Sequence, residues 1–219
     1  MFKYLVVLGL LVAPQAFAEN AANDFTGTYI SIFVDENKAE DEGVEAGGVW
    51  RTDTNADGQS LGMQIGYNWQ LQNNIVVGVE ADYANRINSK GLKSLTENGV
   101  LSSDYNLTTQ MRSSSALNAR FGYKVQSNAL VCVLAGYGSV DLDRSYVEVD
   151  DEYKTFADTQ TGWTTGVGVE YRFETPVYVR LAYRDSDFGS EKKRVDIWEE
   201  TYDQSLTEQS VRITISRPF

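Results

Sequence analysis

Strict two-residue alternation is the feature that most constrains the fold of this chain. From Leu61 to Leu71 every odd position is apolar or aromatic, and every even position is Gly, Gln or Asn. A β-strand has this period because its side chains point alternately to opposite faces of the sheet. The segment therefore predicts a strand with one apolar and one polar face rather than a helix.

The same alternation recurs along the chain and predicts eight strands. Two of them, at residues 25–34 and 129–139, are apolar on both faces, whereas the other six alternate cleanly. The predicted strands cover residues 25–34, 61–71, 75–83, 117–125, 129–139, 163–173, 177–184 and 211–215. We find no linker between them and predict one all-β domain over residues 19–219.

The connections between the predicted strands are of two kinds. Three short turns of polar residues and Pro lie near residues 72–74, 126–128 and 174–176. The four long connections cover residues 35–58, 87–110, 142–156 and 188–207. Short turns at one end and long loops at the other are typical of outer-membrane barrels, with the turns in the periplasm and the loops outside. The pattern predicts an eight-stranded antiparallel up-and-down transmembrane β-barrel.

Residues 1–18 have the layout of a secretory signal peptide. Lys3 supplies a positive charge, residues 5–12 are apolar, and Ala16-Phe17-Ala18 forms a cleavage site of the A-x-A type. The apolar run is too short to span a bilayer as a helix, which disfavours the alternative of a membrane anchor. We therefore expect export through the periplasm.

Composition excludes several classes of function. The chain has no His, so it cannot build a Ser-His-Asp triad, a Cys-His pair or an HExxH metal site, and we expect no enzyme. It has 19 Lys and Arg against 31 Asp and Glu, a formal charge of -12, which argues against a nucleic-acid partner. The single Cys, Cys132, rules out a disulfide within the chain and is expected to be a small buried apolar residue.

The polar face of the predicted strands distinguishes a membrane barrel from a soluble carrier. A soluble barrel would expose this face to water and fill it with Lys, Glu and Thr, but here it is rich in Gly. Eight strands enclose a space just wide enough for side chains, so Gly would make room for long Arg and Glu chains that point inward. The Gly residues on this face are Gly62, Gly66, Gly78, Gly122, Gly162, Gly166 and Gly168.

Three segments carry a resemblance to a known family. The sequence WTTGVGVEYRF at residues 163–173, the opening FTGTY at 25–29 and the terminal Phe219 resemble small eight-stranded outer-membrane proteins. That family includes the transmembrane domain of outer membrane protein A and porin-family surface antigens of Gram-negative bacteria. The resemblance covers essentially the whole mature chain and implies a structural protein, an adhesive or immune-evasive surface, or a narrow channel. It also implies that the barrel-assembly machinery recognises Phe219, although Arg217 and Pro218 depart from the family pattern.

Charged residues on the polar face predict a network inside the barrel. A charge in a narrow lumen must pair, because an isolated buried charge costs several kcal/mol. Two interpretations stay open: a static plug, and, as the resemblance suggests, a gate whose re-pairing opens a small ion path. The candidate residues are Glu80, Asp82, Arg120, Glu170, Arg172, Arg180, Arg184 and Arg212.

One predicted loop contains a possible calcium motif. Residues 53–58 read D-T-N-A-D-G, which fits the opening of a calcium loop with Asp53, Asn55 and Asp57 as ligands. The twelfth position is Gln64 rather than the bidentate Glu, and Asx turns explain the run equally well. We expect no other cofactor.

The predicted loops hold most of the acidic residues. Residues 35–58, 141–158 and 185–208 contain 23 of the 31 carboxylates, which predicts an anionic outer rim or simply a solvated loop surface. The expected partners are outer-membrane lipid, lipopolysaccharide and the barrel-assembly machinery, with the protein itself a monomer. The function we expect is a non-enzymatic structural or surface role; a narrow channel is the alternative, and an outer-membrane enzyme is disfavoured because His is missing.

Overall fold

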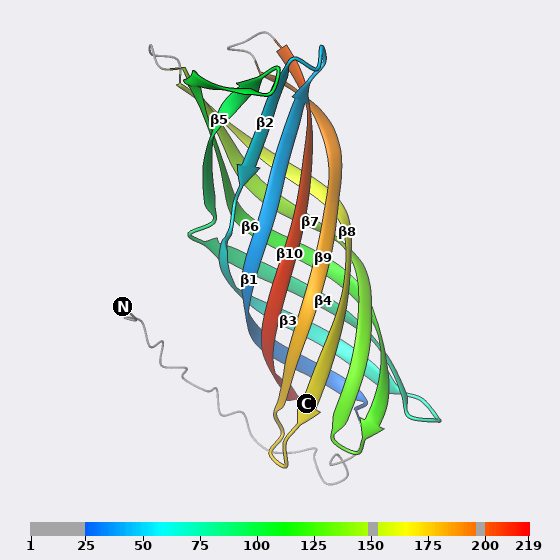
Figure 1. Cartoon of the computed structure of the whole chain (residues 1–219). Helices are drawn as coiled ribbons and strands as arrows, with labels where there is room; N and C mark the ends of the chain where they lie inside the picture. The colour runs from blue at the N-terminus through cyan, green and yellow to red at the C-terminus, as the bar shows by residue number, and fades with distance from the viewer. Residues whose placement is uncertain (1–24, 149–152, 196–199) are drawn as a thin grey trace.

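A single antiparallel sheet contains every strand of the described residues. This computed structural model describes residues 25–148, 153–195 and 200–219, so the predicted signal peptide lies outside the described residues (Figure 1). The described part of the chain has no helix that is long and apolar enough to cross a membrane. Its strands are β1 (Gly27–Glu45), β2 (Trp50–Asn55), β3 (Gly58–Gln70), β4 (Ile75–Ile87), β5 (Lys90–Glu97), β6 (Val100–Gln126), β7 (Ala129–Glu148), β8 (Tyr153–Arg172), β9 (Tyr178–Val195) and β10 (Glu200–Pro218).

The sheet closes on itself as a barrel. The ring runs through β1, β3, β4, β6, β7, β8, β9 and β10, and β10 returns to pair with β1. This seam extends from Tyr29 opposite Pro218 to Glu45 opposite Tyr202. The amide of Phe219 continues it by donating to the Thr28 carbonyl at 2.8 Å. The predicted eight-stranded up-and-down barrel is confirmed.

Strands β2 and β5 continue the ring beyond the ends of β3 and β4. Strand β1 pairs with β3 as far as Gly58 and then with β2 from Asn55. Strand β6 pairs with β4 as far as Asn85 and then with β5 from Lys90. Because β2 and β5 also pair with each other at Trp50 and Arg51, the wall keeps the same number of strands toward its far end.

The predicted short turns are confirmed, but the predicted long loops are wrong over most of their length. Residues 35–58, 87–110, 142–156 and 188–207 are largely strand in the described parts of the chain. Along β1 the inward residues Asp35, Asn37 and Asp41 are as polar as the outward residues beside them. In this part of β1 buried and exposed side chains still alternate, but both kinds are polar. The sequence therefore shows no alternation of apolar and polar residues there.

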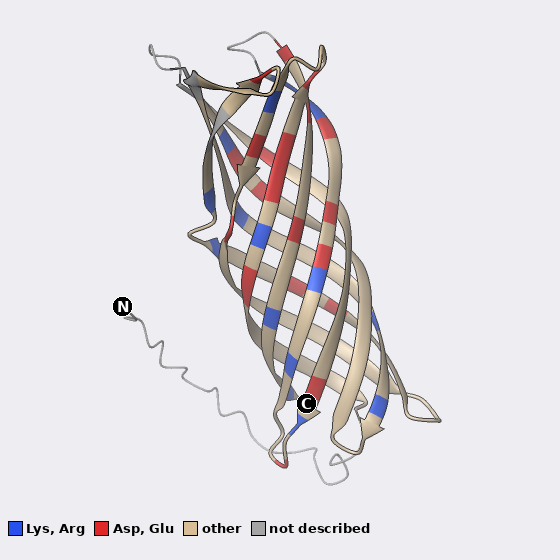
Figure 2. Ribbon diagram, in the orientation of Figure 1, with Lys and Arg blue, Asp and Glu red and all other residues tan. Residues whose placement is uncertain are grey.

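The barrel has a turn end, with the short turns and the C-terminus, and an opposite loop end (Figure 1). Between them the outward face is an apolar belt whose side chains are about half exposed; examples are Ile65, Val79, Val167 and Ile213. Charged residues gather on the loop-end half of the ribbon (Figure 2). Exposed aromatic residues mark both rims of the belt, as in a membrane barrel. They are Tyr83, Tyr137, Trp163 and Tyr183 toward the loop end, and Trp69, Tyr123, Tyr171, Phe173 and Phe219 toward the turn end.

The belt can be tested by placing a cation in its middle. Val167→Arg, on the outward face of β8, should cost about 2 to 4 kcal/mol of folding free energy in lipid vesicles, because a cation at the bilayer midplane is poorly solvated. Thr155→Arg on the same strand, exposed beyond the loop-end rim, is the matched control and should change stability little. Equal unfolding free energies for the two variants would show that the apolar face does not contact lipid.

Candidate functional site: charge layers in the barrel lumen

The inward side chains fill the lumen with alternating apolar and charged layers. Their order follows β7, whose inward residues run from Leu130 and Cys132 through Val140 and Leu142 to Tyr146. At the turn end lies the turn-end cap (Phe25, Val76, Leu130, Cys132), followed by the first charge layer (Glu80, Arg120, Glu170, Arg180) and the second charge layer (Asp35, Asp82, Arg184, Arg212). The apolar layer comes next (Ala39, Ala56, Met111, Val140, Leu142, Phe188, Leu206). Beyond it lie the third charge layer (Asp41, Arg144, Asp158) and the loop-end cap (Leu107, Tyr146, Tyr202).

Arg172 ties the turn-end cap to the wall. Its guanidinium lies 4.4 Å from the ring centre of Phe25 and 4.5 Å from that of Tyr178, within the range of cation–π attraction. It also donates a hydrogen bond of 2.8 Å to the Tyr178 hydroxyl. The cap is thus apolar but anchored by a buried cation.

Glu80 on β4 is the centre of the first charge layer. Its carboxylate pairs with the Arg180 guanidinium on β9 through two hydrogen bonds and accepts a third, of 2.6 Å, from the Tyr29 hydroxyl on β1. Arg120 on β6 lies 3.6 Å from Glu80 and 2.7 Å from Glu170 on β8. The layer therefore joins five strands and balances two carboxylates against two guanidiniums.

Two glycines make room for aromatic rings rather than for the Arg and Glu chains predicted from the sequence. A Cβ atom at Gly66 would lie 2.4 Å from the Tyr29 ring, and one at Gly62 would lie 2.2 Å from the Phe33 ring. Both glycines are on β3 opposite these residues of β1, so the two rings pack over them. The Tyr29 hydroxyl reaches Glu80 for this reason.

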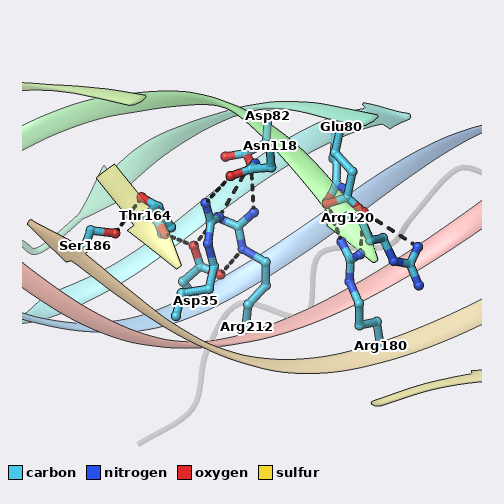
Figure 3. A network of polar contacts seen from close by, with 12 residues as sticks. Asp35, Glu80, Asp82, Asn118, Arg120, Thr164, Arg180, Ser186 and Arg212 are labelled. Carbon is cyan, nitrogen blue, oxygen red and sulfur yellow. Dashed lines mark hydrogen bonds and ion pairs between the residues drawn. The ribbon is translucent and has the colours of Figure 1, made fainter. Parts of the chain in front are cut away.

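The second charge layer connects β1, β4, β9 and β10 (Figure 3). Arg212 donates two hydrogen bonds to Asp35, at 2.7 and 2.8 Å, and its guanidinium stacks 3.5 Å from the Phe33 ring centre. Asp82 accepts a hydrogen bond of 2.9 Å from Asn118 and lies 3.5 Å from both Arg184 and Arg212. Arg184 is the more loosely held of the two cations.

A small cavity lies between the second charge layer and the apolar layer. Its volume is about 20 Å³, enough for about one water molecule. Arg184 and Thr164 line it, together with Phe188 of the apolar layer. Arg86 and Glu208, 2.8 Å apart, pair at its border. The lumen at this level is polar but narrow.

The third charge layer lies beyond the apolar belt. Asp41 accepts hydrogen bonds of 2.8 and 2.6 Å from Arg144 and one of 2.6 Å from Thr109. Burial alone would lower the pKa of Arg144, but the hydrogen bonds and charge of Asp41 outweigh it and raise that pKa. The Asp158 carboxylate accepts one hydrogen bond from Arg144, at 2.7 Å, and one from the half-exposed Lys193, at 2.8 Å. This carboxylate therefore connects the lumen to the surface.

All eight predicted lumen residues are buried on the inward face. The structure brings seven of them into the first two charge layers and places Arg172 in the turn-end cap. Asp35, Asp41 and Arg144 are lumen residues that the sequence pattern does not reveal, because they lie in segments predicted to be loops. The alternation that includes Tyr29 and Phe33, continued by two residues, would have identified Asp35 as inward-facing.

The predicted calcium residues do not form a loop. Asp53 and Asn55 lie on strand β2, and both point outward with exposed side chains, as does Asp57 just after it. Alternate residues of an extended strand are about 6.6 Å apart, whereas calcium ligands converge to within about 2.5 Å of one ion. Among the described residues no group of three or more His, Cys, Asp or Glu could hold a metal ion.

Phe219 lies on the outer surface at the turn end, outside the lumen. The residue is 61% exposed, and the Arg217 guanidinium lies 5.9 Å from the ring centre. Its backbone amide donates the hydrogen bond to Thr28 described above. The ring is therefore accessible at the edge of the belt.

The sequence has relatives among outer-membrane proteins. A 31 kDa outer-membrane immunogenic protein of Brucella melitensis biotype 1 is 26% identical over 238 residues, an alignment that covers 100% of this chain and 95% of the relative. A 22 kDa outer membrane protein of Rhizobium leguminosarum is 29% identical over 154 residues, which cover 70% of this chain and 63% of the relative. Both are named as outer-membrane proteins rather than as enzymes.

The fold also has a counterpart among solved structures. The outer membrane protease OmpT of Escherichia coli superposes with a TM-score of 0.50 at 11% identity, covering 88% of this chain and 97% of OmpT, a likeness of fold alone. Residues 4–217 match the family described as the outer membrane protein beta-barrel domain. The chain therefore belongs to this outer-membrane β-barrel family and is a protein of the Gram-negative outer membrane.

Proposed function

We propose that this protein is a closed, non-enzymatic barrel that presents a rigid extension on the cell surface. The observation that carries the proposal is the succession of buried side-chain layers across the lumen, from the turn-end cap to the loop-end cap, among the described residues. With the turns in the periplasm, the loop end is the extracellular end. The lumen then stabilises the wall, and the outward surface beyond the belt carries the interactions of the protein.

The size and pairing of the lumen groups support a closed barrel. The cavity beside Arg184 has room for about one water, not for a column of water or a hydrated ion. Opening a path through the first charge layer would separate Glu80 from Arg180 inside a narrow protein interior. Separating such a buried pair costs about 3 to 5 kcal/mol, so the closed state is strongly favoured.

Strand length supports a role at the surface. A membrane barrel needs about 10 residues of each strand to cross the hydrocarbon, whereas β6 runs from Val100 to Gln126. Its lipid-facing part begins at Leu117, so more than half of the strand lies beyond the belt. There β6 pairs with β5 along one edge and, from Tyr105 onward, with β7 along the other. The name of the Brucella relative, an immunogenic protein, fits such surface exposure.

A narrow channel is the second candidate function, and one observation favours it. Arg184 contacts Asp82 and Asn118 only at 3.5 Å and lines the cavity, so its charge could change partners at small cost. An enzyme has less support. The chain has no His, and the lumen carboxylates of the first charge layer are bound to guanidiniums.

Planar-bilayer recording separates the closed barrel from the channel. The refolded protein should give no stable conductance steps, because side chains fill its lumen at the first and second charge layers. Arg184→Met should leave this baseline unchanged. Discrete steps in the wild type that change size in Arg184→Met would contradict the closed barrel and support the channel. A heat-dependent gel shift of each sample confirms that the barrel is folded.

The first charge layer should contribute to stability. Glu80→Gln leaves Arg120 and Arg180 to share Glu170, and we expect a loss on the order of 3 kcal/mol of unfolding free energy. Urea titration in lipid vesicles measures it. Glu36→Gln on the exposed face of β1 makes the same chemical change at the surface and should leave stability nearly unaltered. An equal effect of the two substitutions would show that the layer does not hold the wall.

Recognition of Phe219 by the barrel-assembly machinery is a separate part of the proposal. Phe219→Ala keeps the backbone hydrogen bond of the seam but removes the accessible ring. We expect several-fold less folded barrel in the outer membrane, with unchanged export. Phe173→Ala removes another exposed aromatic ring from the same rim and is the control. If both variants accumulate alike, the terminal ring has no special role in assembly.

A further inference from the structure

Short hydroxyl side chains line the outward face of β6, β7 and β8 directly above the loop-end aromatic rim. Ser115, Ser139 and Thr161 lie opposite one another in one row across the three strands. Ser113, Asp141 and Thr159 form the next row. We call these six residues the hydroxyl face.

Hydrogen bonds fix the hydroxyl face within the sheet. Ser113 and Thr159 donate to the two oxygens of Asp141, at 2.8 and 2.7 Å, and Ser115 and Ser139 bond to each other at 3.0 Å. Tyr137 of the aromatic rim donates to Thr161 at 2.9 Å. Hydrogen bonds from Thr159 and Ser113 also lower the pKa of Asp141, so its carboxylate stays ionised. The Ser113, Thr159 and Tyr137 hydroxyl protons are donated to other groups of the face or its rim. The oxygen atoms keep further lone pairs that can accept hydrogen bonds from a ligand.

The chemistry of this face suits a ligand that donates many hydrogen bonds. Its six residues include one carboxylate and no cation, and their oxygens can accept from hydroxyl groups. The Arg112 guanidinium lies 3.5 Å from Asp143, and its charge also lowers the pKa of Asp141. Other exposed residues beyond the belt, such as Glu36 on β1, Gln59 on β3 and Gln209 on β10, have long side chains. The Ser, Thr and Asp side chains of the hydroxyl face are shorter.

The position of the face identifies the molecule beside it. Trp163, whose side chain is 67% exposed, lies just below Thr161, and its ring contacts Tyr137 edge-on at 5.3 Å. The lipid-facing belt ends at these two aromatic residues, so the hydroxyl face is continuous with the lipid interface. The group next to it is the headgroup region of the outer leaflet, which in this membrane carries the saccharide of lipopolysaccharide.

We propose that the hydroxyl face binds the core saccharide of membrane-resident lipopolysaccharide. Hydroxyl groups of the core sugars would donate to Asp141 and to the Ser and Thr oxygens, and Trp163 would pack below them against the lipid A part of the molecule. This inference goes beyond the closed barrel and does not depend on it, because it concerns the outward surface alone. A conducting barrel could bind in the same way.

Lipid binding to the folded barrel in micelles tests this proposal. The probes are lipopolysaccharide with its core saccharide and lipid A, which lacks that saccharide, each titrated in EDTA so that divalent ions cannot bridge phosphates. We expect about tenfold tighter binding of the saccharide-bearing lipid to the wild type, as a few hydrogen bonds can supply. Ser139→Ala/Thr161→Val should remove most of this preference. Ser205→Ala/Thr207→Val on the outward face of β10 is the matched control and should keep it.

Several results would overturn the proposal. Equal affinity of the wild type for the two lipids would show that the core saccharide is not bound, whether or not the variants fold. Loss of all binding in EDTA would point to phosphates bridged by cations. Equal loss in the β10 control would show that the effect is not specific to this face. Free core saccharide that binds as tightly as the intact lipid would assign the face to a soluble glycan instead.

Discussion

The hydrogen-bonded seam between β1 and β10 is the constraint on which the rest of this structure depends. Hydrocarbon offers no partner to a backbone N–H or C=O group, so a strand can lie in the membrane only if both of its edges are paired. The seam meets this need from Tyr29 to Glu45 and is completed by the amide of Phe219. Closing the sheet also fixes its strand number and therefore its diameter. A ring of this width cannot hold a column of water, and its inward side chains must fill the space themselves.

Filling a narrow lumen couples residues that are far apart in sequence. Glu80 on β4 is neutralised by Arg180 on β9, and its third hydrogen bond comes from Tyr29 on β1. Tyr29 reaches it only because Gly66 leaves room for the ring. A larger residue at Gly66 would displace the ring, and a neutral one at Glu80 would leave guanidiniums without a counter-charge. Closure of the barrel fixes the register of the strands, and the register decides which inward side chains meet. The sizes and charges of these side chains must therefore match across the barrel.

Sequence analysis predicted the barrel because the membrane separates the two faces of each strand so sharply. In most strands of the belt the outward residues are apolar and many inward ones are Gly or polar, as in Val167 and Gly168, and the two-residue period is plain. Beyond the belt both faces meet polar surroundings, and residues such as Asp35 and Asp41 were assigned to loops although they are inward residues of β1. The lumen residues could be named, but their pairing could not, because it depends on the stagger between strands. The stagger is a property of the closed ring and not of any one segment.

The outward faces beyond the belt are where such a barrel has freedom to vary. Inward residues are bound to their partners across the lumen, and belt residues must stay apolar. The extension carries two different surfaces: exposed carboxylates on β1 and β2, where Glu42 lies directly opposite Asp53, and the hydroxyl face on β6, β7 and β8. Like charges placed opposite each other destabilise a sheet, which sets a limit on how much acid one face can hold. Because both surfaces are part of paired strands, binding to them would require little loss of backbone freedom, unlike binding to a flexible loop. In the function that we propose, the long strands therefore serve recognition by holding polar surfaces rigid above the membrane.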